Sequence, residues 1–158
     1  MSDIQIIGVL GAGQMGSGIA QVAAAAGWSV KLADASRELA EKARGKIDGG
    51  LKKLVEKGKV DAAEAAATVE RIAPVGSIAE LADCDLVVEA ATEDLALKLD
   101  LFRQLDIAVK PGAILASNTS SISITRIAAA TKRPELVVGM HFFNPVPLMK
   151  LVEVIRGL

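Results

Sequence analysis

The sequence predicts a doubly wound α/β fold with a mostly parallel sheet and a helical hairpin inserted after the second strand. Short apolar segments alternate along the chain with longer segments of helical character, which is the pattern of parallel strands joined by crossover helices. Hydrophobic residues make up 51% of the 158 residues but aromatic residues only 3%, so aliphatic side chains must fill the core, as in buried parallel strands. A glycine-rich turn after the first apolar segment supports the same class.

The beginning of the chain contains the first two predicted strands. Residues 4–10 form an apolar run that stops at a Gly-Ala-Gly turn, and residues 15–26 are Ala-rich and suited to a helix. Residues 28–33 form a second apolar run that ends at Asp34. A strand, a helix and a parallel strand are therefore complete within about 30 residues.

A helical hairpin is predicted next. Ser36 is suited to cap a long amphipathic helix that continues to about Lys57, and residues 61–72 form a second, Ala-rich helix. Along the first helix, apolar residues recur at three- and four-residue steps, at Leu39, Ala43, Ile47, Leu51, Leu54 and Val55. Such a helix pair is longer than a crossover connection requires.

The remaining elements continue the alternation of strands and helices, bounded by turn or cap residues. Strands are predicted over residues 72–75, 85–90, 113–117, 136–140 and 151–155. The strand over 85–90 is interpreted as entirely apolar and buried. Helices are predicted over residues 95–109 and 123–131, with a brief helix capped by Ser77.

The composition excludes several kinds of partner. The net charge is −1 and basic residues are dispersed among acidic ones, so no footprint for a nucleic acid or an anionic membrane is present. No apolar run reaches the roughly 20 residues that span a bilayer, and no basic leader precedes the first strand. A lone Cys84 excludes an internal disulfide, offers no metal-ligand spacing, and is interpreted as a small buried hydrophobe. We expect a cytoplasmic domain whose partner is a small molecule.

Residues 11–16 read Gly-Ala-Gly-Gln-Met-Gly, a G-x-G-x-x-G pattern that follows a predicted strand and opens a predicted helix. Gly11 permits a tight turn, Gly13 lets a pyrophosphate approach the backbone, and Gly16 lets the helix pack closely on the strand. The unpaired N–H groups at the helix N-terminus would bind the phosphates. We therefore predict a Rossmann-type dinucleotide site; a glycine turn that serves packing alone is the alternative. The predicted cofactor contacts in this motif are Gly11, Gly13, Gln14, Met15 and Gly16.

Asp34, at the end of the second predicted strand, indicates which dinucleotide binds. Its carboxylate can accept hydrogen bonds from both hydroxyls of the adenosine ribose, whereas the 2′-phosphate of NADP would meet a like charge. Arg37 is near enough in sequence to attract that phosphate, so NADP remains the alternative. We predict NAD as the cofactor.

A later segment is polar where an α/β sheet binds ligands. Residues 116–121 read Ala-Ser-Asn-Thr-Ser-Ser and follow an apolar strand, at the predicted carboxyl edge of the sheet. Helix capping would account for Ser121 and Ser123, but it explains less of Asn118 and Ser120.

His141 is the single histidine, and Glu153 follows it in the next predicted strand. An isolated histidine is most often structural, but an imidazole can accept a proton from an alcohol near neutral pH. A neighbouring carboxylate would select its tautomer and stabilise the imidazolium. If the turn containing Pro145 and Pro147 joins two adjacent strands, His141 and Glu153 come together.

Five segments, in the same order along the chain, resemble the 3-hydroxyacyl-CoA dehydrogenase family, nearest to its bacterial 3-hydroxybutyryl-CoA dehydrogenase branch. They are Gly-Ala-Gly-Gln-Met-Gly-Ser-Gly-Ile-Ala-Gln from Gly11, Val-Val-Glu-Ala from Val87, Ser-Asn-Thr-Ser-Ser from Ser117, His-Phe-Phe-Asn-Pro-Val-Pro from His141 and Leu-Val-Glu-Val-Ile from Leu151. The resemblance implies an NAD-dependent oxidoreductase that converts (S)-3-hydroxyacyl-CoA, with 3-hydroxybutyryl-CoA as the expected substrate, to 3-ketoacyl-CoA, or runs the reverse reduction.

The resemblance also implies roles for individual residues. In the catalytic set, His141 would be the general base, Glu153 its carboxylate partner and Ser120 the hydroxyl that holds the substrate oxygen, with Asn144 in support. The implied contacts outside the catalytic set are Glu93, Lys98 and Asn118 toward the cofactor and Lys53 and Lys57 toward the CoA phosphates. Ordinary solvent-facing helix charges explain Glu93, Lys98, Lys53 and Lys57 nearly as well.

Members of the family carry a second, all-helical domain that supplies another active-site Asn, part of the acyl pocket and the dimer contact. We expect residues 1–158 to be the NAD-binding domain alone, with that domain absent, so that full activity and a homodimer depend on it. A crystallin-like or regulatory relative that binds NAD without turnover remains an alternative. Another NAD-dependent 3-hydroxyacid dehydrogenase is a further alternative, against which the His-Phe-Phe-Asn-Pro segment argues.

Overall fold

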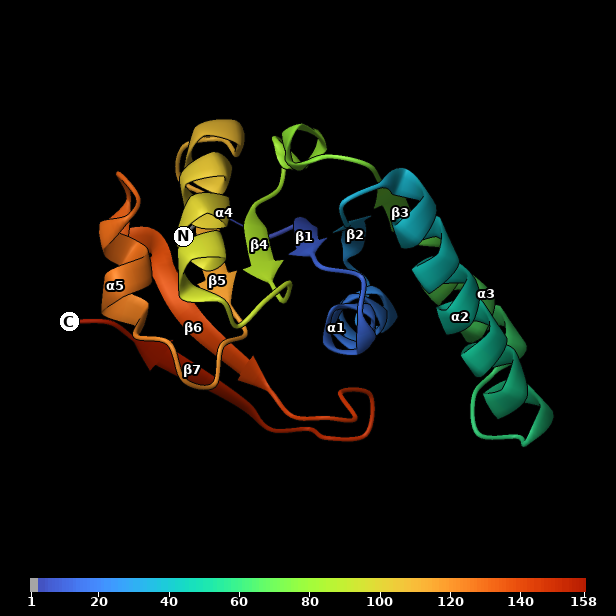
Figure 1. Cartoon of the computed structure of the whole chain (residues 1–158). Helices are drawn as coiled ribbons and strands as arrows, with labels where there is room; N and C mark the ends of the chain where they lie inside the picture. The colour runs from blue at the N-terminus through green and yellow to red at the C-terminus, as the bar shows by residue number, and fades with distance from the viewer. Residues whose placement is uncertain (1–2) are drawn as a thin grey trace.

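A computed structural model describes residues 3–158, which form one seven-stranded sheet in the order β3-β2-β1-β4-β5-β6-β7 (Figure 1). Neighbouring strands from β3 to β6 are parallel, and β7 is antiparallel to β6. The strands are β1 (Ile6–Leu10), β2 (Ser29–Ala33), β3 (Ile72–Val75), β4 (Leu86–Glu89), β5 (Ile114–Ser117), β6 (Val137–Phe142) and β7 (Val152–Arg156). The predicted doubly wound class is confirmed.

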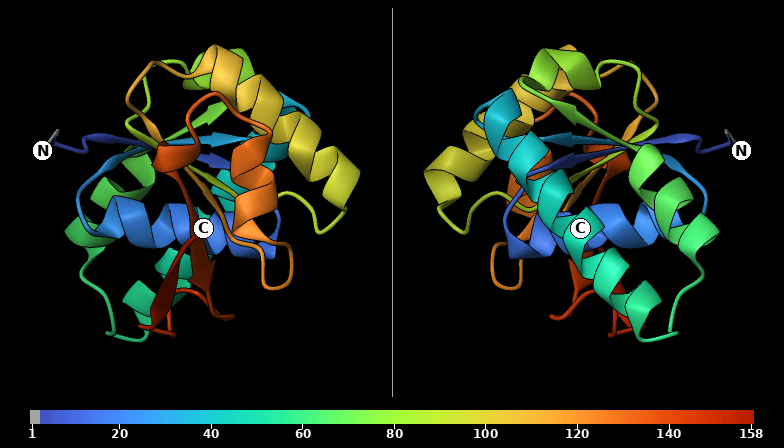
Figure 2. Two further views of the ribbon diagram at one scale, coloured as in Figure 1. Left: turned by 90° about the vertical axis from the view of Figure 1, so that its left-hand side faces the viewer. Right: turned by 90° about the vertical axis from the view of Figure 1, so that its right-hand side faces the viewer.

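Helices cover both faces of the sheet, and the side views of Figure 2 show the two helical layers. The α-helices are α1 (Gln14–Ala25), α2 (Arg37–Glu56), α3 (Ala62–Glu70), α4 (Leu95–Ala108) and α5 (Ile124–Ala129), and the short 3₁₀ helices are η1 (Ile78–Leu81) and η2 (Pro134–Leu136). Successive strand residues point to opposite faces, so Val9 belongs to the core that includes residues of α1 and the hairpin, whereas Leu10 belongs to the core that includes residues of α4 and α5. The apolar strands therefore fill two cores.

The predicted hairpin of α2 and α3 is present, and the Ser36 hydroxyl caps α2 by accepting a hydrogen bond from the Leu39 N–H. The prediction that Leu39 belongs to the buried face was wrong, because its side chain is 47% exposed. The buried stripe begins one residue later, at Ala40, and continues at the helical spacing from that position. Ser77 precedes η1 as predicted but makes no capping hydrogen bond.

Cys84 is fully buried, which confirms its interpretation as a small core side chain. Burial raises the pKa of its thiol to about 12. A Cβ atom at Gly8 would lie 3.0 Å from the Cys84 sulfur, so a larger residue at this position in β1 would force the neighbouring core side chains to shift. Among the described residues, no helix is both long and apolar enough to cross a bilayer.

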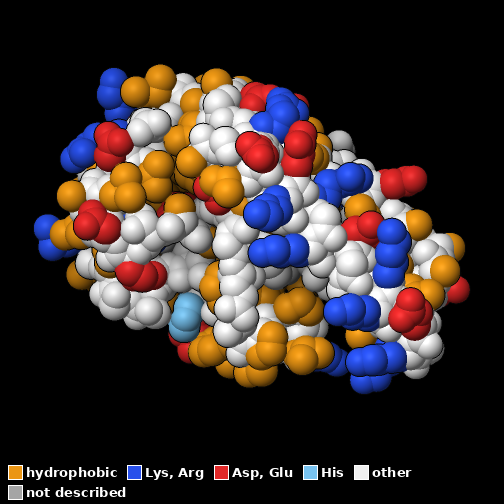
Figure 3. Space-filling view, turned by 45° about the vertical axis from the view of Figure 1, so that its right-hand side comes forward, with side chains coloured by type: hydrophobic (Ala, Val, Ile, Leu, Met, Phe, Trp, Pro, Cys, Tyr) orange, Lys and Arg blue, Asp and Glu red, His pale blue; other side chains and the backbone are white. Residues whose placement is uncertain are grey.

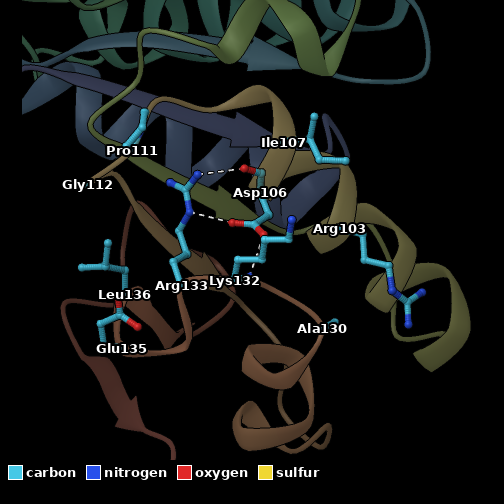
Figure 4. Close-up of a pocket in the computed structure, with 10 residues that line it drawn as sticks. All are labelled: Arg103, Asp106, Ile107, Pro111, Gly112, Ala130, Lys132, Arg133, Glu135 and Leu136. Carbon is cyan, nitrogen blue, oxygen red and sulfur yellow. Dashed lines mark hydrogen bonds and ion pairs between the residues drawn. The ribbon is translucent and has the colours of Figure 1, made fainter.

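A hollow of about 650 Å³ lies where α4 ends and β5 begins, at the amino edge of the sheet (Figure 4). Arg133 is nearly buried beside it and binds the Asp106 carboxylate at 2.8 Å. The same guanidinium donates to the carbonyl oxygens of Asp106, Val109, Lys110 and Ala113. These bonds satisfy carbonyls at the C-terminal end of α4 and in the loop that leads to β5, so Arg133 has a structural role. Ligands of open α/β sheets bind at the opposite, carboxyl edge.

Candidate functional site

The glycine turn after β1 has the geometry that each glycine was predicted to provide. Gly11 has a φ of +112°, and a Cβ atom there would lie 2.6 Å from the carbonyl oxygen of Ala90. A Cβ atom at Gly16 would overlap the carbonyl oxygen of Gly11, so α1 can approach β1 only with a glycine. Nothing lies within 4 Å of a Cβ atom placed at Gly13, which leaves its backbone open to a ligand.

The N-terminus of α1 fits a pyrophosphate. Gly13 is the N-cap residue and no side chain caps the helix, so the N–H groups of Gln14, Met15 and Gly16 have no partner within it. These donors and the positive end of the helix dipole face the open space beside Gly13. The residues present therefore suit the diphosphate of a dinucleotide.

Asp34 follows β2 and lies against the glycine turn. Its Oδ2 accepts the N–H of Ala12 at 2.7 Å and its Oδ1 accepts the N–H of Ala35 at 2.6 Å. These two bonds fix the carboxylate beside the turn, and the remaining lone pairs can accept further donors. The contact of Asp34 with a ribose stays a prediction.

The strand order reverses between β1 and β4, and a cleft of about 230 Å³ lies at the carboxyl edge beside this switch point. Four predicted cofactor contacts line it, namely Met15, Glu93, Lys98 and Asn118. The other lining residues, Ala90, Ala91 and Thr92, belong to the loop after β4. The fold thus brings together residues from three separate predicted segments.

Lys98 is not a solvent-facing helix charge, and that interpretation was wrong. Its side chain is 1% exposed and its Nζ lies 2.6 Å from Oε1 of Glu89, which is fully buried. The Ser117 hydroxyl accepts from Lys98 at 3.1 Å and donates to Glu89 at 2.8 Å. Glu89 Oε2 accepts the N–H groups of Ala91 and Thr92. This cluster of Glu89, Lys98 and Ser117 ties together the loop, α4 and β5 around the cleft.

The sequence reasoning missed Glu89 and treated its strand as entirely apolar. The available signal was a carboxylate inside a buried apolar run, because a charge in that position requires a partner. Glu93 also has partners: its Oε2 accepts the hydroxyls of Thr119 at 2.9 Å and Ser121 at 3.3 Å. Ser121 therefore joins two loops, whereas Ser123 caps α5 as predicted.

His141 and Glu153 face each other directly across β6 and β7. The Nδ1 atom lies 3.7 Å from Oε2 of Glu153, which is beyond a hydrogen bond but within reach of an ion pair with an imidazolium. The His141 side chain is 23% exposed, and Figure 3 shows the histidine at the surface. Because Nδ1 is turned to the carboxylate, Nε2 is the nitrogen left for a substrate.

Asn118 connects the cleft to the histidine. It lines the cleft, and its Oδ1 accepts the N–H of Phe142 at 2.8 Å, next to His141 in β6. Ser120 is exposed in the same loop and, within residues 3–158, makes no hydrogen bond with His141 or Glu153. Within the described residues, the structure thus joins Asn118 to the histidine strand and forms no hydrogen bond between Ser120 and the His141–Glu153 pair.

A second cleft, of about 460 Å³, lies between α1, α2 and the turn after β6. Gly13, Gln14 and Asn144 line it, together with Lys46. The sequence did not indicate that Lys46 lines a cleft, because it resembles any exposed helix charge. Lys53 and Lys57 are exposed near the end of α2 and line neither cleft. Figure 3 shows basic side chains over the hairpin, mixed with acidic ones.

The strand order, the uncapped glycine turn and the carboxylate after β2 define a Rossmann-type dinucleotide-binding domain. Residues 6–158 match the family described as 3-hydroxyacyl-CoA dehydrogenase, NAD binding domain. The chain therefore belongs to the NAD-binding domains of the 3-hydroxyacyl-CoA dehydrogenase family, and its dinucleotide is NAD, as the resemblance implied.

Relatives from several bacteria match nearly the whole chain. It is 56% identical to a Deinococcus radiodurans protein named "Probable 3-hydroxybutyryl-CoA dehydrogenase", over 95% of this chain and 54% of that protein. It is 50% identical to the 3-hydroxybutyryl-CoA dehydrogenase of Bradyrhizobium diazoefficiens, over 98% of this chain and 53% of that protein. The crystal structure of (S)-3-hydroxybutyryl-CoA dehydrogenase from Ralstonia eutropha matches with a TM-score of 0.95 at 46% identity, and the match covers 99% of this chain and 55% of that chain. The chain spans about half the length of the curated relatives it matches.

Proposed function

We propose that this chain provides the NAD-binding and acid–base half of a dehydrogenase that oxidises (S)-3-hydroxyacyl-CoA to 3-ketoacyl-CoA, or runs the reverse reduction, with 3-hydroxybutyryl-CoA as the substrate. The observation that carries the proposal is the His141–Glu153 pair at the carboxyl edge of the sheet, joined through Asn118 to the cleft at the switch point. The names of the relatives support the substrate class.

In this proposal His141 is the general base. Bound NAD supplies a hydride acceptor. His141 takes the hydroxyl proton at Nε2, because its Nδ1 is turned to Glu153. The imidazolium that forms gains a negative partner in the Glu153 carboxylate, which lies at ion-pair distance. In the reverse direction the same imidazolium returns the proton to the carbonyl oxygen.

Other residues are assigned to binding. The Ser120 hydroxyl would hold the substrate oxygen and Asn144 would support the same site; both are exposed at the carboxyl edge, where a substrate can reach them. Lys53 and Lys57 would meet the CoA phosphates, since both are exposed four residues apart near the C-terminal end of α2.

The cofactor contacts follow from the two sides of the glycine turn. Asp34 would accept the hydroxyls of the adenosine ribose, because backbone N–H groups already hold its carboxylate beside the turn. Glu93, Lys98 and Asn118 would contact the second ribose, and the support is that all three line the cleft at the switch point. The buried Glu89 would hold Lys98 in that position.

We also propose that residues outside this chain complete the acyl pocket and form a homodimer contact. Ser120 and Asn144 are exposed and the Glu153 side chain is 52% exposed, so the site is open on the side of the histidine. We therefore expect the 158-residue chain to bind NAD but to turn over acetoacetyl-CoA far more slowly than a full-length relative.

The test compares the chain with its His141→Gln variant in hydride transfer from NADH to acetoacetyl-CoA, at high protein concentration. The variant should be slower by roughly 10²–10⁴-fold, because general acid–base catalysis contributes that much. Its NAD affinity, measured by calorimetry, should change less than about twofold, since the ring does not line the cofactor cleft. Equal rates for both proteins, at a turnover above the background without protein, would return His141 to a structural role. The same comparison in a protein that also carries the second domain separates the two alternatives, because NAD binding without any transfer there would favour a non-catalytic relative.

A further inference from the structure

Arg37 is the first residue of α2, three positions after Asp34, so its side chain begins close to the predicted ribose site. A free guanidinium there would attract the 2′-phosphate of NADP, because Arg binds phosphate through paired N–H donors. The structure directs this guanidinium elsewhere. Its Nη2 lies 2.7 Å from Oε1 of Glu80, and its Nη1 donates to the carbonyl oxygen of Pro74 at 3.2 Å.

Glu80 is itself held in place from several sides. Its Oε2 accepts the N–H of Gly76 at 2.6 Å and the hydroxyl of Ser77 at 3.4 Å. The Nζ of Lys31 donates to the main-chain oxygen of Glu80 at 3.0 Å, which anchors η1 to β2. The hydrogen bond from Gly76 and the charge of Arg37 lower the pKa of Glu80 against the opposing effect of desolvation.

Gly76 also allows the start of α2 to lie close to the loop after β3. A Cβ atom there would lie 3.1 Å from the Cβ of Arg37 and 3.2 Å from its nitrogen, so a larger residue would push α2 away from the loop after β3. Within residues 3–158, the ion-pair partner of Arg37 is Glu80 and not Asp34. The Asp34 carboxylate is therefore not neutralised by the neighbouring arginine.

We propose that Glu80 contributes to cofactor specificity beside Asp34: it holds Arg37 away from the 2′ position of the adenosine ribose, and so favours NAD over NADP. The inference rests on the proposed contact between Asp34 and that ribose. Arg37 and Glu80 are 54% and 37% exposed, so their ion pair contributes little to the stability of the fold. The ion pair instead sets the direction in which the Arg37 guanidinium points. We therefore expect that Glu80 can be replaced without unfolding the chain.

The variant that tests this is Glu80→Gln, because the amide oxygen can still accept the Gly76 N–H while the neutral side chain no longer forms an ion pair with the guanidinium. Calorimetry of the 158-residue chain with NADP and with NAD should show NADP affinity rising by about threefold to fivefold, the upper range for an exposed ion pair. NAD affinity should change less than about twofold. Raising the salt concentration should reduce the NADP gain, since charges in contact with water are screened.

Two controls separate positioning from charge alone. Asp83→Asn removes the same charge from the same segment, but Asp83 pairs with Lys31 at 2.6 Å, so the ratio of NADP to NAD affinity should stay unchanged. In an Arg37→Met background, Glu80→Gln should also leave the ratio unchanged.

An equal gain from Asp83→Asn, a gain that persists without Arg37, or no gain from Glu80→Gln would each overturn the inference and leave the proposed NAD site intact. A wild-type chain that binds neither dinucleotide would overturn both. Glu80 acts here through Arg37. The measured quantity is the ratio of NADP affinity to NAD affinity. Loss of folding would lower both affinities and would therefore leave this ratio unchanged.

Discussion

Breaking the buried ion pair of Glu89 and Lys98 should destabilise the domain, and the two single substitutions should differ. Lys98→Met leaves the Glu89 carboxylate with three of its four donors, namely the Ser117 hydroxyl and the N–H groups of Ala91 and Thr92. Glu89→Gln leaves the ammonium with neutral acceptors alone, the Ser117 hydroxyl and the new amide oxygen, and with no counterion. Removing one member of a buried pair costs about 3–5 kcal/mol, so we expect Lys98→Met near the lower figure and Glu89→Gln near the upper.

The double variant should lose less free energy of unfolding than the two single variants lose together. The difference should be about 1–3 kcal/mol, because in the double variant neither charge is left without a partner. Urea unfolding can be followed by fluorescence of the single tryptophan, Trp28, which is 40% exposed and donates to the carbonyl of Ile4. Lys52→Met is the matched control, since Lys52 pairs with Asp48 on the surface and should cost less than about 1 kcal/mol.

A Lys98→Met variant as stable as the control would refute the reasoning, as would losses that simply add. NAD affinity supplies a second readout. Because Glu89 and Lys98 fix the walls of the cleft, both single variants should weaken NAD binding even where the protein remains fully folded. Unchanged affinity in the folded variants would restrict the pair to a structural role.

Two further predictions concern acid stability and the glycine turn. Lys110 and the backbone N–H groups of Gln5 and Ile6 lower the pKa of Asp85 from 3.8 to about 2. The Asp85 carboxylate therefore adds about 1 kcal/mol to the free energy of unfolding above pH 4, and this contribution is lost as the pH falls toward 2. Asp85→Asn should remove that part of the acid dependence in urea unfolding at several pH values. Gly16→Ala should lower the Tm strongly by overlap with Gly11, whereas Gly13→Ala should keep the Tm and weaken NAD binding in calorimetry; the reverse order would contradict the assigned roles.

The glycine turn could be predicted in detail because each glycine meets a local backbone requirement. The first strand, the turn and the helix follow one another in sequence, so spacing alone places Gly11, Gly13 and Gly16. Lys98 could not be placed in the same way. It belongs to a helix with exposed charges, and only the packing of α4 against β4 and β5 shows that its ammonium is buried. Leu39 was misplaced for a related reason, since only the packing of α2 shows that Ala40 is buried and Leu39 is exposed.

The sequence by itself determined the order of the elements, the dinucleotide turn and the family resemblance, because periodicity, turn chemistry and motif spacing are local properties of the chain. Only the tertiary structure decided which side chains meet. Glu153 faces His141 through the register of two antiparallel strands, and Arg37 binds Glu80, 43 residues away, because β3 lies beside β2. Register and strand order depend on packing of the whole core, so the partners of the charged groups, and with them the chemistry of the site, follow from the fold.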